Sequence, residues 1–583
     1  MNQPFIKAGI SACLLSLVLS GCVDNDYDLS NIDTTTEIKV KDLVLPVNIQ
    51  AVTLNDIIDV DQDSKIKTVE IDGKEFYAVT ESGSISSDGI TVDGFTAPAP
   101  TVNTAYARYR LDTPATRGVT LENYYELSSF SAQTVEFRAE NIDSSIKSLS
   151  SIDMQPLHID LAMTTNGFGD ETAISFPVLE LQFLKGLTFE SLPAGYQYNA
   201  STGVLKIENL PCPNHKADIN LVATAIDFTA SGTDIAGNSL DFKSEVKPIS
   251  GRVKTVSTFE TGTTPSVPNE IEFIVNTTAE AMTATYITGD IGYHLEGDGL
   301  NINPVDLSDI PDFLNESGTD LRLANPQIYL NLSNPVAADG LYYQTGLELG
   351  AVRNGSIKYY ELDNNGVVRV EKTSAGPFNF VLSPSMPTEP LKDYASGLKH
   401  VPFTGLSDVL SGEGLPSSIE INLINPELPA QHMEHFELNK TIPGVTGSYE
   451  FFAPLALKDG SVIIYSDRID GWNDEDVDKI IIETLEIEAD VTSTIPLGAK
   501  LTAWPIDKDG HRIGDVHIEG ADIEALAKGK HINIRATGEI RHLDGITFDA
   551  VVRPGSEETL SPNQTISLEN IKAKVSGSYT TDF

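Results

Sequence analysis

The sequence predicts a mostly β protein, in which several antiparallel β-sandwich domains follow one another in tandem with a few short helices. Apolar and polar residues alternate along many short runs, and this alternation is the period of a strand with one buried face. Such runs lie at residues 43–49, 157–161, 480–487 and 571–575. Turn dipeptides separate runs of this kind, as at Asp72-Gly73, Asp459-Gly460, Asp509-Gly510 and Asp544-Gly545. Helical patterns are short and lie at residues 306–315, 406–410 and 521–528.

Residues 1–21 are predicted to be a signal peptide, because their apolar run of residues 10–19 is shorter than the roughly 20 residues that a transmembrane helix needs. The run ends in Leu19-Ser20-Gly21-Cys22, which resembles the lipobox of bacterial lipoproteins. The resemblance implies cleavage before Cys22 and attachment of acyl chains such as palmitate to this residue. The alternative is an ordinary secretory signal in which Cys22 lies near the cleavage site without carrying a lipid.

Residues 22–36 are predicted to be an acidic tether, since Asp24, Asp26 and Asp28 follow the cysteine closely. The stretch resembles the acidic signal that directs some Gram-negative lipoproteins to the outer face of the outer membrane. We therefore expect an outer-membrane lipoprotein that faces the cell surface, with the periplasmic face as the second choice. Two or three acyl chains hold a protein firmly on a membrane, whereas one chain binds marginally.

The net charge of the chain limits which partners it can bind, and its cysteine content limits how its fold can be stabilised. The 583 residues include 39 Lys and Arg against 84 Asp and Glu, a formal net charge of −45. Nucleic acid is therefore not an expected partner, because binding a polyanion requires a basic face. After loss of the signal peptide only Cys22 and Cys212 remain, so we expect no disulfide within a lipidated chain and several buried cores instead.

Stretches rich in Gly, Ser, Thr and Pro predict linkers at residues 81–103, 261–269 and 383–397. After the signal peptide and the tether, the expected domains are a β domain at 37–135 and β-sandwiches at 136–262, 266–385 and 400–583. The last of these is long enough to hold two packed units.

An internal similarity supports duplication of a sandwich unit. Residues 328–335 and 419–426 align without gaps, and both read as a strand followed by Asn-Pro. Proline has no amide proton, so it is expected to end each strand. The pattern resembles the immunoglobulin-like sandwich of water-stress and desiccation proteins, and this resemblance implies a fold and no function.

One acidic segment offers candidate metal ligands. Asp59, Asp61, Asp63 and Glu70 have the spacing of oxygen ligands in an EF-hand calcium loop. However, Ser64 replaces the glycine of that loop, and residues 68–73 read as a strand and a turn. The open interpretations are an EF-hand, another calcium loop, or an acidic approach to a hairpin. We expect no other cofactor.

A second acidic loop contains candidate ligand-binding residues. Trp472 lies between Asp470 and Asp474, and an aromatic ring beside carboxylates is suited to binding a sugar. The alternative is a solvated loop whose tryptophan covers the edge of a sandwich. Trp504, within an alternating run, is expected to be buried, and His432 and His435 are expected to lie in a surface loop between strands.

The sequence contains neither a Gly-x-Ser-x-Gly motif nor a Walker or dinucleotide-binding glycine pattern. We therefore expect a non-enzymatic, lipid-anchored cell-surface protein that binds a glycan or a protein partner. The alternatives are a glycoside hydrolase or lyase on a β scaffold, and a purely structural envelope or fimbria-like component. With 84 acidic residues, a catalytic carboxylate pair cannot be selected from spacing alone.

Overall fold

The computed structural model describes residues 35–45, 52–57, 65–71, 73–110, 120–127, 131–258, 270–295, 300–307, 314, 316–412, 416–472 and 480–582. Nearly all regular structure in these ranges is β strand, in several antiparallel sheets, so the predicted fold class is confirmed. Within the same ranges, no helix has the length and apolar character needed to cross a membrane.

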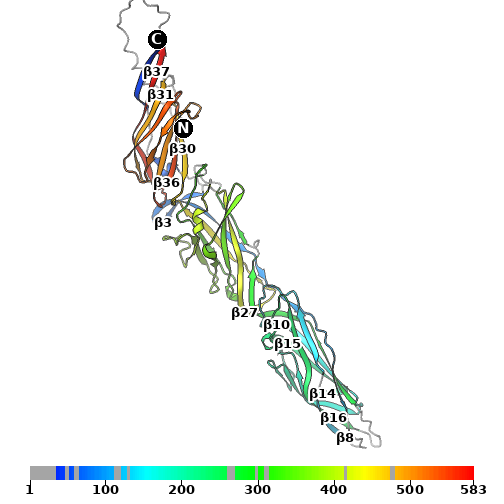
Figure 1. Ribbon diagram of the computed structural model, residues 1–583. Coiled ribbons are helices and arrows are strands. Elements are labelled where there is room, and N and C mark those ends of the chain that lie inside the picture. The colour runs from blue at the N-terminus through cyan, green and yellow to red at the C-terminus, as the bar shows by residue number, and fades with distance from the viewer. Residues whose placement is uncertain are drawn as a thin grey trace, which may run out of the picture.

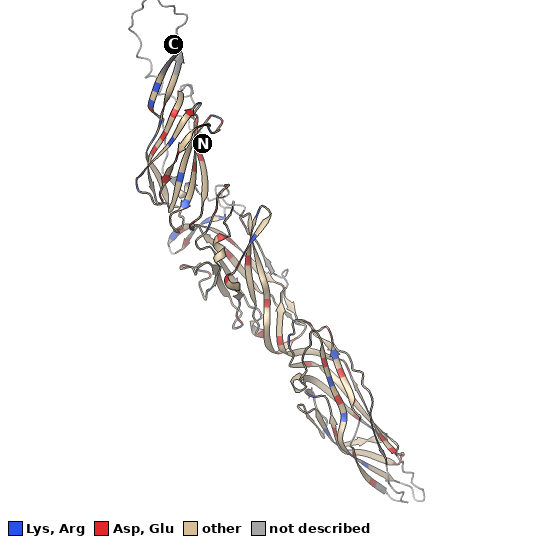
Figure 2. Ribbon diagram, viewed as in Figure 1, with Lys and Arg blue, Asp and Glu red and all other residues tan. Residues whose placement is uncertain are grey.

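Three sandwiches lie in a row and form an elongated rod (Figure 1). The terminal sandwich contains both ends of the described chain, the distal sandwich lies at the opposite end of the rod, and the middle sandwich joins the two. In the view of Figure 2, acidic and basic residues are interspersed along the length of this rod.

The terminal sandwich consists of two facing sheets. The first has the order β1 (Thr35–Leu45), β37 (Thr565–Asp582), β31 (Ile480–Ser493), β35 (Lys530–Ile540) and β33 (His517–Glu519), with β2 (Val52–Thr53) also paired to β37. The second has the order β30 (Ile463–Ile469), β36 (Gly545–Pro554), β32 (Leu497–Ile506) and β34 (Ala521–Ile523). Most of their buried residues form one apolar core, whereas Ile463 and Ile495 belong to the core that continues into the middle sandwich. Helix α1 (Leu54–Ile57) follows β2.

The middle sandwich has one sheet of its own and shares the other. Its own sheet has the order β19 (Leu300–Ile302), β4 (Lys74–Ser87), β29 (Thr446–Pro454), β21 (Gln327–Leu332), β25 (Phe378–Ser383) and β26 (Lys399–Pro402), with β3 (Ile66–Ile71) paired to β4. Only β25 and β26 run parallel among these strands. The facing strands are β27 (Ser418–Glu437), β22 (Gln344–Arg353), β23 (Ser356–Glu361), β20 (Val305–Asp306) and β24 (Val368–Arg369).

The distal sandwich packs two sheets through apolar and aromatic contacts such as that of Phe176 with Phe273, whose ring centroids are 6.2 Å apart. One sheet contains β12 (Leu187–Phe189), β15 (Lys216–Asp227), β10 (Ser151–Asn166), β17 (Glu270–Ala279) and β7 (Ala105–Arg110). The other contains β13 (Tyr196–Asn199), β14 (Val204–Cys212), β11 (Thr172–Gln182), β16 (Leu240–Thr258), β8 (Thr120–Leu127) and β9 (Gln133–Ala139).

A single sheet connects the middle and distal sandwiches. Strand β18 (Met282–His294) pairs with β10 on one side and with β27 on the other. The apolar cores of the two sandwiches are continuous along this sheet, whereas the terminal sandwich has a largely separate core. The middle and distal sandwiches are thus joined by both backbone hydrogen bonds and apolar packing.

Short elements complete the described chain. Strands β5 (Ile90–Thr91) and β28 (Thr441–Ile442) pair with each other, and β6 (Thr96–Ala97) pairs with β18. Short 3-10 helices are η2 (Pro213–His215), η3 (Phe228–Ala230), η6 (Ala337–Asp339), η7 (Asp363–Asn365) and η8 (Thr404–Asp408).

The chain runs out along the rod and back again. Strand β1 pairs with β37, so Thr35 lies opposite Asp582, although most of the sequence separates them. The segment from β8 to β16 builds most of the distal sandwich, and the later strands return to the terminal sandwich. The sheets therefore combine strands from several of the consecutive segments expected as domains. The predicted domain at 37–135, for example, contributes strands to all three sandwiches.

Several local predictions differ from the structure. Residues 81–87 of the predicted first linker belong to β4, because Val79 and Ile85 are buried and the strand pairs with β29. Residues 521–528 form β34 and a turn instead of a helix. Strand β21 ends at Leu332 before its Asn-Pro, as expected, whereas β27 continues through Pro426 to Glu437. Most of the predicted helix at 306–315 and of the linker at 261–269 lies outside the described residues.

Candidate functional site

The predicted calcium loop is only partly within the described chain. Asp59, Asp61 and Asp63 lie outside the described residues. Glu70 lies in β3, opposite Glu75 of β4, and its side chain is exposed. Residues 66–71 therefore form a strand at the position where an EF-hand would begin its second helix, as the strand-and-turn interpretation expects. Calcium binding by this segment stays a prediction.

The predicted sugar-binding loop begins at the end of β30. The amide of Trp472 donates a hydrogen bond of 2.7 Å to the carbonyl oxygen of Asp544, and the partly buried Trp472 side chain packs against the terminal core. The carboxylate of Asp470 lies 3.2 Å from Nε of Arg468. Asp474 lies outside the described residues. The packing of Trp472 fits a residue that covers the edge of the sandwich.

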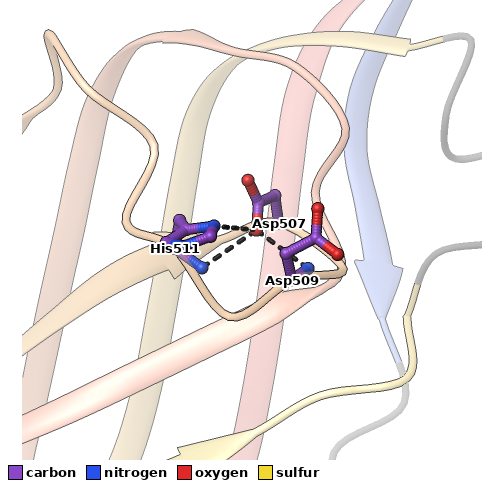
Figure 3. A group of neighbouring side chains, drawn as sticks. All are labelled: Asp507, Asp509 and His511. Atoms are coloured by element: carbon purple, nitrogen blue, oxygen red, sulfur yellow. Dashed lines mark hydrogen bonds and ion pairs between the residues drawn. The ribbon is translucent and has the colours of Figure 1, made fainter.

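A turn of the same sandwich brings three metal-type ligands together. Asp507, Asp509 and His511 follow β32, and one ligand atom from each lies within 4.8 Å of the others (Figure 3). Sequence reasoning identified the Asp509-Gly510 turn but not this group. The signal that could have found it is three ligand-type residues at alternate positions around a turn glycine.

The bonds within the turn explain why these residues lie together. Oδ1 of Asp507 accepts hydrogen bonds of 2.9 Å from the amides of both Asp509 and His511, and Nδ1 of His511 lies 3.8 Å from the same oxygen. The amide of His511, followed by that of Asp509, lowers the pKa of the Asp507 carboxyl. Because one carboxylate oxygen already accepts two backbone hydrogen bonds, a metal ion would have to compete for it. The arrangement is that of an Asx-type turn.

Asp507→Ala is expected to destabilise the terminal sandwich, because two backbone amides lose their acceptor in this turn. Urea unfolding should detect this as a lower midpoint. The control is Asp509→Ala, since the exposed Asp509 side chain caps no amide of this turn. Equal midpoints for the two variants would contradict the turn-closing role of Asp507.

Trp504 is on the outer face of its sheet, which differs from the burial expected. Its neighbour Ala503 is 1% exposed and belongs to the core, so the alternation of a strand turns Trp504 outward. The guanidinium of Arg512 lies 5.1 Å from the Trp504 ring centroid and also pairs with Asp549 at 2.5 Å. An Arg512 side chain that covers the ring accounts for an aromatic residue on this face.

His432 and His435 lie within β27 rather than in a loop. Nδ1 of His432 is 3.2 Å from Asp290, which faces it across the strand pair, and Nδ1 of His435 is 2.9 Å from Asp153. The His435 ring also stacks on Tyr286, with 4.1 Å between centroids. Each histidine has its own carboxylate partner, so the two do not form one ligand set.

The thiol of Cys212 does not have the properties of a catalytic nucleophile. The residue is 3% exposed, and burial raises the pKa of its thiol to about 11. The reactive form of a cysteine is the thiolate, which is scarce at neutral pH for such a group.

One half-buried carboxyl should make stability depend on pH. Burial, followed by the nearby charge of Asp393, raises the pKa of Glu450 on β29. A carboxyl with a raised folded pKa favours folding at low pH, and this contribution is lost as the pH rises through the folded pKa. Glu450→Gln is therefore expected to be more stable than the parent at pH 7, with a difference below about 1 kcal/mol because the group is partly solvated.

Thermal unfolding of both proteins between pH 4 and pH 8 checks this expectation. The Glu450→Gln advantage should shrink as the pH falls and Glu450 becomes protonated in the parent. A constant difference across this range would contradict ionisation of Glu450 as its cause.

Comparisons with known proteins leave the family of this chain open. No family model matches the chain, and no curated protein matches it. A crystal structure of a protein from Parabacteroides distasonis that is thought to be secreted aligns with 50% of this chain and 90% of its own, at 16% identity and a TM-score of 0.36. A chain from an archaeal virus with a triple jelly roll fold covers 84% of this chain and 91% of its own, at 8% identity and a TM-score of 0.10. TM-scores this low assign no fold or function.

Proposed function

We propose that this chain is a lipid-anchored, non-enzymatic protein of the cell surface that holds its distal sandwich away from the outer membrane and binds a glycan or a protein partner. The observation that carries the proposal is the path of the chain. Strand β1, which follows the lipobox-like sequence, lies at one end of the rod, and the distal sandwich lies at the other (Figure 1).

The segment between Cys22 and β1 is short enough to keep the terminal sandwich near the membrane. From Cys22 to Thr35 the chain advances 13 residues, which span at most about 45 Å when extended. A lipid on Cys22 would thus hold the terminal sandwich close to the membrane surface. The distal sandwich would then be the part of the molecule farthest from the lipid.

A rod that holds one sandwich far from the membrane is suited to binding a glycan or a protein outside the cell. Loops and strand edges of sandwiches are common binding surfaces. The acidic composition would keep such a protein soluble at a high density on the surface. It also disfavours strongly acidic partners.

Protease treatment of intact cells tests the placement. The distal and middle sandwiches should be degraded while a periplasmic control protein survives. Resistance of the whole chain until the outer membrane is permeabilised would overturn the surface assignment in favour of the periplasmic face.

A glycan array probed with the lipidated full chain in detergent tests the partner class. A reproducible hit supports glycan binding. A blank array together with crosslinking of the chain to one envelope or host protein would support a protein partner. A blank array with no crosslinked partner would contradict the binding role and favour a spacer.

A further inference from the structure

A cleft of about 740 Å³ lies where the middle and terminal sandwiches meet. Its wall comes from the hairpin of β3 and β4, the ends of β21 and β29, the loop at residues 387–389 and the loop at residues 557–563. The volume is within the range of roughly 300–1,000 Å³ that is usual for ligand sites, and such sites occur preferentially between domains. No local sequence signal reveals this cleft, because segments far apart in the chain build it.

Backbone hydrogen bonds fix the two sides of the cleft relative to each other. The amide of Tyr77 donates to the carbonyl of Leu560 at 2.9 Å, and the amide of Leu560 donates to the carbonyl of Leu455 at 2.9 Å. Ala456 and Thr559 form an isolated β-bridge at the same place. The loop of the terminal sandwich is thereby attached to the middle sandwich, so the cleft exists before any ligand binds. A preformed site loses less conformational entropy on binding.

Part of the cleft lining is aromatic and apolar, beside neutral polar residues such as Asn325 and Gln327. The rings of Phe76 and Phe452 meet edge to face, with 6.3 Å between centroids and an interplanar angle of 69°. Phe452 is 2% exposed, whereas Phe76 is partly exposed to the cleft that both residues line. Pro387 and Pro454 extend the apolar lining. The partly exposed Phe76 and Pro454 therefore give the apolar contact surface, and the buried Phe452 supports the Phe76 ring.

The rim of the cleft has a strong excess of negative charge. Glu75, Glu389, Glu557 and Glu558 line it, and Lys74 is the basic residue among its described lining residues. Their side chains are exposed. Across the described parts of the chain, no ion pair of 4.0 Å or less involves any of these four carboxylates. Their charges are therefore available to a ligand.

We propose that this cleft binds a small linear polycation, an aliphatic amine with two or more ammonium groups along an apolar chain. Carboxylates on the rim attract the ammonium groups, and because these carboxylates are exposed, salt should weaken the attraction. The apolar chain lies against the partly exposed Phe76, whose ring also stabilises an adjacent cation. The same rim repels acidic sugars and phosphates. This inference does not depend on the identity of the partner proposed for the rod as a whole.

Isothermal titration of the full chain in detergent with spermidine, at low and at physiological salt, tests the proposal. We expect one saturable site that weakens as salt increases. Glu557→Gln/Glu558→Gln should weaken binding at least tenfold, and Phe76→Ala should weaken it several-fold without changing the salt dependence. Both glutamates are exposed, so their replacement should leave thermal unfolding unchanged.

The matched control is Glu519→Gln/Glu569→Gln, which removes two exposed charges from strands of the same sandwich away from the cleft. This pair should leave the affinity for spermidine unchanged. An equal loss with both pairs of substitutions would show diffuse attraction to an acidic protein and overturn the proposal. Absence of a saturable site, or saturable binding of a neutral trisaccharide that is lost with Phe76→Ala while spermidine fails to bind, would also overturn it.

Discussion

Replacing Cys22 with alanine is expected to remove nearly all of the protein from the outer-membrane fraction and to abolish labelling with palmitate. The expected effect is large because two or three acyl chains make membrane attachment effectively complete, and each buried methylene contributes about 0.8 kcal/mol. Cell fractionation and metabolic labelling with a palmitate analogue measure both outcomes.

The two other cysteines provide matched controls for this experiment. Cys13→Ala lies within the predicted signal peptide, and Cys212→Ala removes a buried thiol of the distal sandwich. Both variants should keep the lipid label. A Cys22→Ala protein that still sediments with the outer membrane and still carries label would contradict the proposed anchor.

Asn334→Ala is expected to cause the largest loss of stability among the polar substitutions considered, about 3 kcal/mol. The Asn334 side chain is fully buried, and its Nδ2 donates to the carbonyls of Leu341 and Glu371 at 2.9 and 3.0 Å. Its Oδ1 accepts from the amide of Val336 at 3.2 Å. Removal leaves buried backbone groups without partners, and each such group costs about 1–3 kcal/mol. Urea unfolding of the full chain should show a lower midpoint for the middle sandwich.

The equivalent residue of the second Asn-Pro copy is the control. Asn425 is exposed and has φ +48°, so Asn425→Ala loses only the tolerance of asparagine for the left-handed conformation. The expected cost is about 1 kcal/mol. A similar loss of stability in the two variants would show that burial of Asn334 is not the reason for its effect.

The strands were predictable where one face is buried. In β10, Leu157, Ile159 and Leu161 are buried as the alternation requires. A short alternating run does not determine which of its two faces is inside. In β32 the small Ala503 lies in the core, whereas Trp504 lies on the outer face, where Arg512 leaves it partly buried. From the sequence, Trp504 is expected to be buried.

The arrangement of the strands was not predictable from local patterns. The pairing of Thr35 with Asp582 joins opposite ends of the chain, and no nearby residue indicates it. Proline was expected to end the strand at Pro426, but β27 continues because only one amide is missing and a bulge opposite Gln344 and Gly346 absorbs the irregularity. The order of strands in each sheet thus depends on partners that are distant in the sequence.

The same distinction applies to the candidate sites. The acidic loop around Trp472 was visible in the sequence, whereas the packing of its ring on the core depends on the surrounding sheets. The cleft at the junction combines the β3–β4 hairpin with a loop almost 500 residues later in the sequence, around Glu557. Such a site becomes visible only when the path of the chain is known.

Electron microscopy of the lipidated protein in nanodiscs, with a gold label on a tag after Phe583, tests the central claim most directly. The account predicts a rod that projects from the disc with the gold beside the disc, because β37 pairs with β1 at the anchored end. The distal sandwich should be at the free end. Gold at the free end of the rod, or a rounded particle lying on the disc, would contradict it.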